Sequence, residues 1–392
     1  MRIRTVLAWF GALAVAGLVA CSEGQPPPLR RLEGARDVVS IAVPEQGVFT
    51  FVSLFPANAI RVVNEANGQL LREQRLPQLP LSLAVGAGPT HLAAIGTTLL
   101  ATTLLEPSLV ALNAALVKTR SGNAVSIARA RLPVAPAALV AARTSAFVSL
   151  PEESVVMEFK VVDAGNVTLG DTLPLPFAPG LLATVAHPAS SAADQPANNP
   201  GPLLREVWVS GFNQARAQRL DGTGAITLTS VPRAIAAMGD TFAALQDDGV
   251  TLDLWNTDTL EKRARIELPE PCRYLATQFL SGLSVQHVLP NETTSTLVAL
   301  DAVIWASGLD GRIFLVRVPD GSSTTAPYLV RRTAELPYAL DFRPQLDLNE
   351  VLGPPGRIRS EGRALYVVLE AGVVVKLDPP TAAAGVGVQF YR

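Results

Sequence analysis

Residues 303–317 read V-I-W-A-S-G-L-D-G-R-I-F-L-V-R: a run of β-prone residues, a short turn, and a second run with apolar residues at alternate positions. Two such runs around an Asp-Gly turn predict a hairpin of antiparallel strands. The pattern occurs six more times, starting at Phe49, Thr98, Ser145, Glu206, Thr241 and Ala364. Seven copies at steps of 35 to 62 residues predict a repetitive all-β fold with variable loops.

A second marker, an apolar residue followed by proline, stands between the copies. Proline has no amide hydrogen to donate, so such a pair ends a strand and starts a crossing loop. The pairs are Leu76-Pro77, Leu132-Pro133, Leu173-Pro174, Val231-Pro232, Leu268-Pro269 and Leu336-Pro337. A short apolar segment follows most of them, and we expect it to form an inner strand; these segments are residues 81–85, 137–141, 181–185 and 275–279. The repeating unit is therefore predicted to hold four strands.

Four-stranded units at this period, with no sustained helical periodicity, predict a seven-bladed β-propeller of four-stranded antiparallel blades over residues 36–392. The alternative is a pair of β-sandwiches or a solenoid. Three stretches break the period, at residues 188–202, 282–302 and 343–357. The second contains V-Q-H-V-L and T-L-V-A-L around P-N-E-T-T, and we expect it to form an extra hairpin.

The start of the chain resembles the signal peptide of a bacterial lipoprotein. Arg2 and Arg4 precede an apolar run too short to span a bilayer comfortably, and residues 18–21 spell the lipobox L-V-A-C. The resemblance implies that residues 1–20 are removed and that Cys21 carries covalent lipid. Residues 21–35, with three consecutive prolines, then form a tether. The alternatives are an ordinary signal peptide or an N-terminal membrane helix.

The same resemblance predicts an address in the cell envelope. Two or three acyl chains anchor a protein far more firmly than one, because each buried methylene contributes roughly 0.8 kcal/mol. Ser22 stands where a lipoprotein kept at the inner membrane has Asp, so we expect placement at the outer membrane. The side of that membrane is left open.

The order of apolar-Pro pair, inner strand, hairpin and outer strand also resembles bacterial YVTN-type propeller repeats, over nearly the whole mature chain. Those repeats carry Asn after the first hairpin strand and Asp after the second. Here Ser149, Ser210 and Ser307 stand near the first place, and Asp221 or Asp378 near the second. The resemblance therefore implies a shared fold and leaves function open.

Composition excludes several function classes. The formal net charge is −2, which gives no reason to expect nucleic acid as a partner. With Cys21 used for lipid, Cys272 remains alone, and we expect it to be a buried apolar residue. The sequence lacks G-x-S-x-G, H-E-x-x-H, C-x-x-C-H, a phosphate-binding glycine loop and a calcium loop. We therefore predict no catalytic residue, no metal ligand and no cofactor beyond the lipid on Cys21.

Histidine and tryptophan offer two further patterns. The three histidines, His91, His187 and His287, lie in different units, and a metal site would need all of them to converge. Isolated polar histidines are the simpler expectation. The tryptophans within recurring hairpins are expected to pack between adjacent blades; they are Trp208, Trp255 and Trp305.

Five of the seven hairpin turns are acidic. In a propeller these turns share one face, where clustered carboxylates attract cations or a basic partner segment. The residues are Glu106, Glu152, Glu153, Asp247, Asp248, Asp310 and Glu370. The alternative is that acidic residues simply make good hairpin turns.

Together the patterns predict a monomeric, lipid-anchored module of the cell envelope that binds or scaffolds a protein or polymer partner on one propeller face. The first alternative is a propeller-class hydrolase, a lactonase or glycan-active enzyme, with carboxylates holding a divalent ion near the axis. The second is a component of an envelope assembly machine. Several Asp, Glu, Asn or His side chains converging near the axis around a bound ion would favour the enzyme, whereas an apolar or mixed groove would favour the scaffold.

Overall fold

The computed structural model describes residues 35–56, 58–64, 83–84, 88–116, 127–187, 203–280, 284–287, 296–299, 302–309, 313–319, 326–329, 355–361, 364–369, 374–377 and 388–391. Cys21, Asp310 and Glu370 lie outside these ranges, so the predictions made for them are not tested by the structure. Within the described ranges, no helix is long and apolar enough to cross a membrane.

The first three sheets follow one another along the chain, and each has four strands in sequence order. The first contains β1 (Ala35–Val43), β2 (Gly47–Leu54), β3 (Ala59–Asn64) and β4 (Leu83–Ala84). The second contains β5 (Pro89–Ile95), β6 (Thr98–Thr103), β7 (Ser108–Asn113) and β8 (Ile127–Arg131). The third contains β9 (Ala138–Ala142), β10 (Ser145–Leu150), β11 (Val155–Asp163) and β12 (Asn166–Pro174).

An eight-stranded sheet comes next and consists of two four-stranded meanders joined at their inner strands. The first meander is β13 (Pro179–Ala186), β14 (Val207–Gly211), β15 (Arg216–Arg219) and β16 (Ala225–Thr227). The second is β17 (Ala234–Met238), β18 (Thr241–Leu245), β19 (Thr251–Asn256) and β20 (Lys262–Glu267). β13 and β17 pair in parallel, at Val185 with Ala237 and Ala186 with Met238.

The remaining strands form two four-stranded sheets and a separate hairpin. One sheet is β21 (Cys272–Phe279), β24 (Ala302–Gly308), β25 (Ile313–Arg317) and β26 (Tyr328–Leu329), and the hairpin between its first two strands is β22 (Ser284–His287) and β23 (Thr296–Ala299). The last sheet is β27 (Pro355–Glu361), β28 (Ala364–Leu369), β29 (Val374–Leu377) and β30 (Val388–Tyr391). Helical residues in the described chain form short 3-10 turns at η1 (Ala114–Leu116), η3 (Pro151–Glu153) and η4 (Leu203–Glu206).

Burial along the strands explains the sequence pattern. Second strands such as β6, β10 and β18 are buried at every position, because sheets pack against both of their faces. The outer strand β12 is largely exposed, and it carries polar residues between apolar ones. Polar residues between apolar ones therefore mark exposed fourth strands such as β12, whereas the second strands read as continuous apolar or small-residue runs.

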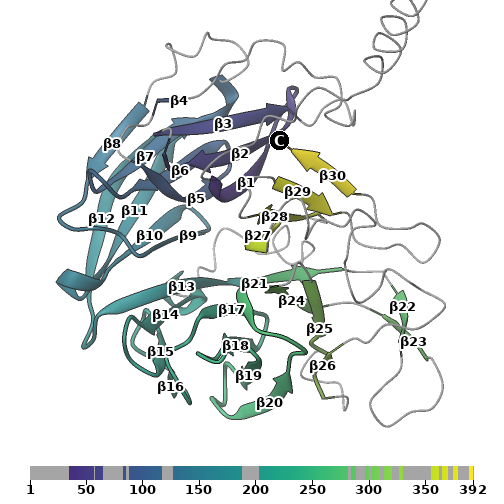
Figure 1. Ribbon diagram of the computed structural model, residues 1–392. Helices are drawn as coiled ribbons and strands as arrows, with labels where there is room; N and C mark the ends of the chain where they lie inside the picture. Colours follow the sequence, from purple (N-terminus) through teal and green to yellow (C-terminus); the bar gives the residue numbers. More distant parts are fainter. Residues whose placement is uncertain are drawn as a thin grey trace, which may run out of the picture.

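The sheets are arranged around a common centre (Figure 1). Clusters of buried apolar side chains join neighbouring sheets. The first and last sheets also pack together, because Val38, Val52 and Leu54 share a cluster with Tyr366 and Val368. The sheets therefore close into a ring. Each terminal sheet is built from consecutive strands of its own, so the ring closes by side-chain packing between sheets rather than by a strand borrowed from the other end.

The structure confirms most of the predicted pattern. Each copy of the recurring hairpin forms the second and third strands of a four-stranded meander. The insertion at 282–302 contains the expected hairpin, and Cys272 is buried as expected. The prediction for residues 81–85 is wrong: β4 within that segment pairs with β3 as an outer strand, and the inner strand of the next sheet is β5. A short apolar run fits either place, so its pattern alone does not distinguish them.

An aromatic stack joins the two halves of the eight-stranded sheet. The ring centroid of Phe242 lies 4.6 Å from that of Trp208 and 5.8 Å from that of Trp255. Trp208 comes from β14 and the other two rings from β18 and β19. Trp208 and Trp255 thus pack between adjacent four-stranded meanders as expected, and offset aromatic pairs of this kind add to the burial of apolar area.

We predict that Phe242→Ala lowers the free energy of unfolding by about 3–5 kcal/mol, because truncation leaves a cavity between two tryptophans. Guanidinium unfolding followed by tryptophan fluorescence measures the change. Val162→Ala is the control, since Val162 is an exposed residue of β11 and its truncation is expected to change stability by about 0.5 kcal/mol or less. Equal stability of the two variants would contradict the role of the stack.

Candidate functional site

Two features lie together at one end of the ring: a set of turns and the mouth of a central cavity. Inner strands of successive sheets line this cavity, and β13 and β17 run parallel, so equivalent ends of the inner strands point to the same side. The turns between second and third strands lie on that side, and we call them the turn face. Its described residues are 55–56, 58, 104–107, 151–154, 212–215, 246–250 and 309.

Apolar residues hold an equivalent place in several turns. Leu104, Phe212 and Leu309 each directly follow the second strand of their sheet. Their backbone N–H groups donate to the carbonyls of Gly88, Ala178 and Pro271, each the residue just before an inner strand, at 3.0, 2.8 and 3.0 Å. This shared hydrogen bond fixes the three side chains at corresponding positions on the turn face.

Some of these apolar side chains remain open to solvent. Phe212 is 49% exposed, and Leu105, the next residue after Leu104, is 65% exposed. Phe55, which follows β2, occupies the equivalent place in the first sheet and lines the cavity together with Leu104. None of these residues was predicted from the sequence as part of a site. The available signal was an apolar residue continuing past the predicted strand, as in S-L-F-P, T-T-L-L-E-P and S-G-F-N.

The described acidic residues of the predicted face do occupy the turn face, but several have local partners. Glu106 lies 3.3 Å from Arg129, measured from Oε2 to Nη1, and Asp247 lies 3.9 Å from the Nε of Arg233. Glu152 and Glu153 are exposed in the 3-10 turn η3. These carboxylates leave the face acidic at its periphery, beside the apolar positions.

Asp248 stabilises its own turn. Its carboxylate accepts hydrogen bonds from the backbone N–H groups of Val250 and Thr251, both at 2.9 Å, and from the Thr251 hydroxyl at 2.6 Å. Slight burial raises the pKa of Asp248, but these hydrogen bonds outweigh it and hold the pKa below its ordinary value. For this residue, the alternative reading as hairpin chemistry explains the observed contacts.

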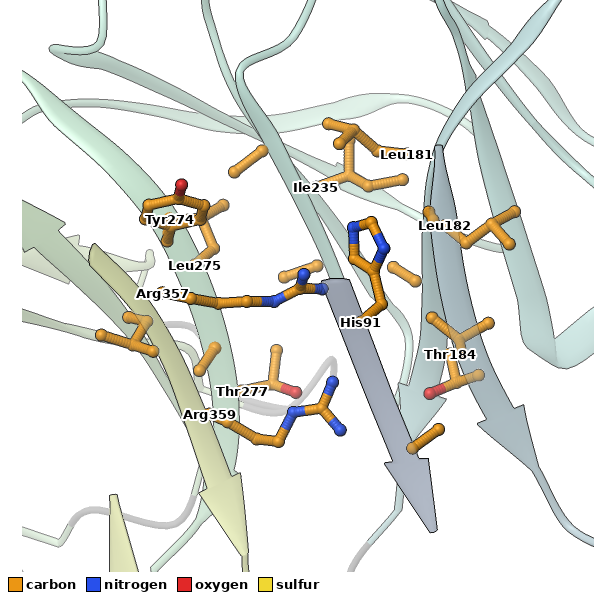
Figure 2. A pocket seen from close by; sticks show the side chains of 18 of the residues that line it. His91, Leu181, Leu182, Thr184, Ile235, Tyr274, Leu275, Thr277, Arg357 and Arg359 are labelled. Atoms are coloured by element: carbon orange, nitrogen blue, oxygen red, sulfur yellow. The ribbon is translucent and has the colours of Figure 1, made fainter. Parts of the chain in front are cut away.

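The central cavity has a volume of about 780 Å³ and divides into an apolar and a cationic part (Figure 2). Leu181, Leu182 and Ile235, with many alanines, form the apolar wall, and Leu275 lies on the side of Arg357 (Figure 2). The charged residues among the described lining are all arginines: Arg36, Arg233, Arg357 and Arg359. Carboxylates that would hold a divalent ion at the axis are not among the described lining residues, and no described group of three His, Cys, Asp or Glu could hold a metal.

Asp37 lies behind Arg357 and Arg359 and holds these two arginines of the cationic part in place. This fully buried carboxylate lies 3.4 Å from the Nε of Arg357 and 3.4 Å from Nη2 of Arg359. It also accepts hydrogen bonds from the backbone N–H groups of Val38 at 2.9 Å and Leu92 at 2.8 Å. Burial raises the pKa of Asp37, but the two arginines and the Leu92 N–H outweigh it, so the pKa is lowered.

His91 lines the cavity beside these arginines. Its Nδ1 lies 3.1 Å from the Thr90 hydroxyl and 3.2 Å from the Thr102 hydroxyl. Burial and the charge of Arg357 lower the pKa of His91 to about 3, against the opposite effect of Asp37. His187 instead lies 3.9 Å from Glu206, and His287 belongs to the inserted hairpin, so the structure does not bring the three histidines together.

Four-stranded antiparallel sheets packed in a ring around a central cavity define a β-propeller. No protein-family model matches the chain, and no curated protein matches it. Among solved structures, similarity extends to a catalytically inactive virginiamycin B lyase from Staphylococcus aureus with quinupristin, with a TM-score of 0.55, 12% identity and coverage of 90% of this chain and 97% of that chain.

Two further structures are similar at comparable levels. BBS1N in complex with ARL6DN has a TM-score of 0.53 and 10% identity, covering 90% of this chain and 93% of that chain. A chain of the mitotic checkpoint complex has a TM-score of 0.52 and 11% identity, covering 94% and 95%. At such identities these likenesses support the β-propeller fold and carry no assignment of activity.

We predict that His91 stays neutral in the folded protein at pH 5. Its folded pKa lies below the ordinary value of 6.5, so the unfolded chain takes up a proton first and stability is lost as pH falls from about 6.5 towards 3. The His91 ring signals in NMR spectra should therefore not titrate between pH 8 and 5. His91→Gln should lose less stability than the wild type over that range, whereas His187→Gln is the matched control. A His91 midpoint near 6.5 would contradict the geometry.

Proposed function

We propose that this chain is a lipid-anchored, seven-bladed β-propeller of the bacterial cell envelope that binds a protein partner through its turn face. The blade number rests on the seven copies of the hairpin, each found within a four-stranded meander. Rigid packing between blades holds the turns in place, so they form a preorganised surface.

The observation that carries the proposal is the set of exposed apolar side chains at, or next to, equivalent turn positions. Phe212 and Leu105 are large and exposed, although nothing in a hairpin turn requires such residues. Exposed aromatic and aliphatic anchors on a rigid surface are typical of protein interfaces. The acidic side chains of Glu106, Glu152 and Glu153 border them, so the surface suits a partner segment with apolar anchors and flanking basic residues.

Two of the structural neighbours support this choice of partner class. Both names, BBS1N in complex with ARL6DN and the mitotic checkpoint complex, describe assemblies of proteins. The hydrolase alternative receives no matching support from the cavity, where the described charged residues are arginines rather than carboxylates. We therefore propose binding rather than hydrolysis.

The envelope address rests on the sequence. Cys21 would carry the acyl chains, and the proline-rich segment 21–35 would hold the propeller away from the bilayer. Ser22 favours the outer membrane in cells that have one. The propeller itself would remain monomeric, because a closed ring of sheets leaves short sheet edges for pairing with other chains.

The anchor is tested by Cys21→Ala. In bacterial cells given a radiolabelled or clickable fatty acid, the wild-type chain should become labelled and sediment with membranes. The variant should lose the label, because its thiol is gone, and should accumulate as a soluble or uncleaved form. Cys272→Ala is the matched control and should keep the label. Equal labelling of Cys21→Ala and the wild type would overturn the anchor.

The partner surface is tested by site-specific photocrosslinking in the native host. A benzophenone amino acid at Phe212 or Leu105 should give the same protein adduct from both positions, because both lie on the turn face. The matched controls are Val162 and Leu169, which are exposed at 65% and 57% but lie on the outer strands β11 and β12. Adducts only with a polysaccharide, or adducts of equal yield from the control positions, would overturn the proposal.

A further inference from the structure

The central cavity has the two-part lining of a small-molecule site. Its volume of about 780 Å³ lies within the range of ligand pockets, roughly 300–1,000 Å³. Leu181, Leu182 and Ile235 make a dry wall, and the arginines of β27 lie across from them (Figure 2). A few placed polar groups on a mostly apolar lining are what such pockets use to orient a ligand.

Arg357 and Arg359 are held as a pair on one side of β27. They are two residues apart on a strand, so their side chains project from the same face. Their side chains are 26% and 20% exposed, which leaves them accessible from the cavity, whereas Asp37 is 0% exposed behind them. The carboxylate therefore positions both guanidinium groups without blocking the cavity.

The charges in this part of the cavity do not cancel. One carboxylate, that of Asp37, faces two guanidinium groups, so one positive charge is in excess. Both oxygens of Asp37 already accept backbone N–H groups as well. A guanidinium has five N–H donors and each of these arginines contacts Asp37 through one nitrogen, so donors remain for an incoming oxyanion.

The other polar groups of the lining do not supply the missing negative charge. Arg36 packs over the Phe55 ring at 5.5 Å, and Arg233 reaches Asp247 at 3.9 Å, whose side chain is largely exposed. His91 is neutral at physiological pH and its Nδ1 is occupied by two threonine hydroxyls. The positive charge of the cavity thus comes from arginine and is constant over the physiological pH range.

We propose that the central cavity binds a small amphipathic carboxylate, with its carboxylate paired to Arg357 and Arg359 and its apolar body packed against Leu181, Leu182 and Ile235. Planar guanidinium groups match a carboxylate in shape and charge. The apolar body would gain from leaving water, so head and tail contribute separately. This inference goes beyond partner binding at the turn face and does not depend on it.

The test uses 4-phenylbutyrate as a soluble probe and 4-phenylbutan-1-ol as its uncharged analogue. Isothermal titration is done with the purified full chain in detergent, and detergent alone is the blank. The wild type should bind the acid at least tenfold more tightly than the alcohol. Equal affinity for the two compounds, or binding of neither, would overturn the proposal.

Variants locate the site. Arg359→Gln should weaken phenylbutyrate binding at least tenfold, and Leu181→Ala should weaken both the acid and the alcohol several-fold. Arg129→Gln is the matched control, since Arg129 is a half-exposed arginine of the outer strand β8. The affinity of this variant for phenylbutyrate should stay within twofold of that of the wild type. An unchanged affinity of Arg359→Gln would overturn the assignment.

A fourth variant separates binding from folding. Arg359→Lys keeps a positive charge next to Asp37 but replaces the planar fork with a point charge. It should keep the thermal midpoint of the wild type within a few degrees and still lose part of the preference for the acid over the alcohol. If Arg359→Gln fails to fold, this variant decides the test: wild-type preference in a folded Arg359→Lys protein would count against the proposal.

Discussion

The closed ring depends on the ion pairs and hydrogen bonds made by the buried carboxylate of Asp37. Asp37 lies on β1 and contacts Arg357 and Arg359 on β27, and it also accepts the Leu92 N–H of β5. Three inner strands are thus tied to one side chain, two of them more than 300 residues apart in sequence. A buried charge of this kind is costly unless it is fully paired, so the first, second and last sheets are all needed before the site becomes favourable. Ring closure and the formation of the ion cluster are therefore one event.

The same closure shapes the cavity. Inner strands that converge on an axis leave little room for side chains, which accounts for the alanines along the wall. Larger residues then stand out: Leu181, Leu182 and Ile235 form an apolar part, and Arg357 and Arg359 lie across from them (Figure 2). The Ser360 hydroxyl donates to the Thr277 carbonyl and ties β27 to β21, so the arginine strand is fixed on both flanks. Because the arginines are held this rigidly, binding of a ligand requires little reorganisation of their side chains.

Sequence predicts the local part of this architecture well and the long-range part poorly. The hairpins around residues 145–160 and 303–317 are encoded by alternation and turn residues within fifteen positions, so their strands could be placed. The segment at 81–85 could not, because a short apolar run carries no mark of being inner or outer. R-I-R at 357–359 has the pattern of an exposed alternating strand. R-D-V-V at 36–39 has the pattern of the beginning of a different strand. Only the closed ring brings Asp37 to these arginines, so local sequence patterns do not predict the cationic site.

The turn face and the cavity are continuous, and this has a thermodynamic consequence. Phe55 and Leu104 belong to the turns and also line the cavity, so a partner seated on the turns would contact the rim of its mouth. Under the two proposals above, a ligand in the cavity and a partner on the face would share these side chains. If the ligand changes the affinity for the partner by some factor, the partner must change the affinity for the ligand by the same factor, because coupling between two binding equilibria is reciprocal. A rigid scaffold favours this arrangement, since the coupling needs no conformational change of the blades: shared contacts at the rim, or a mouth covered by the partner, are sufficient.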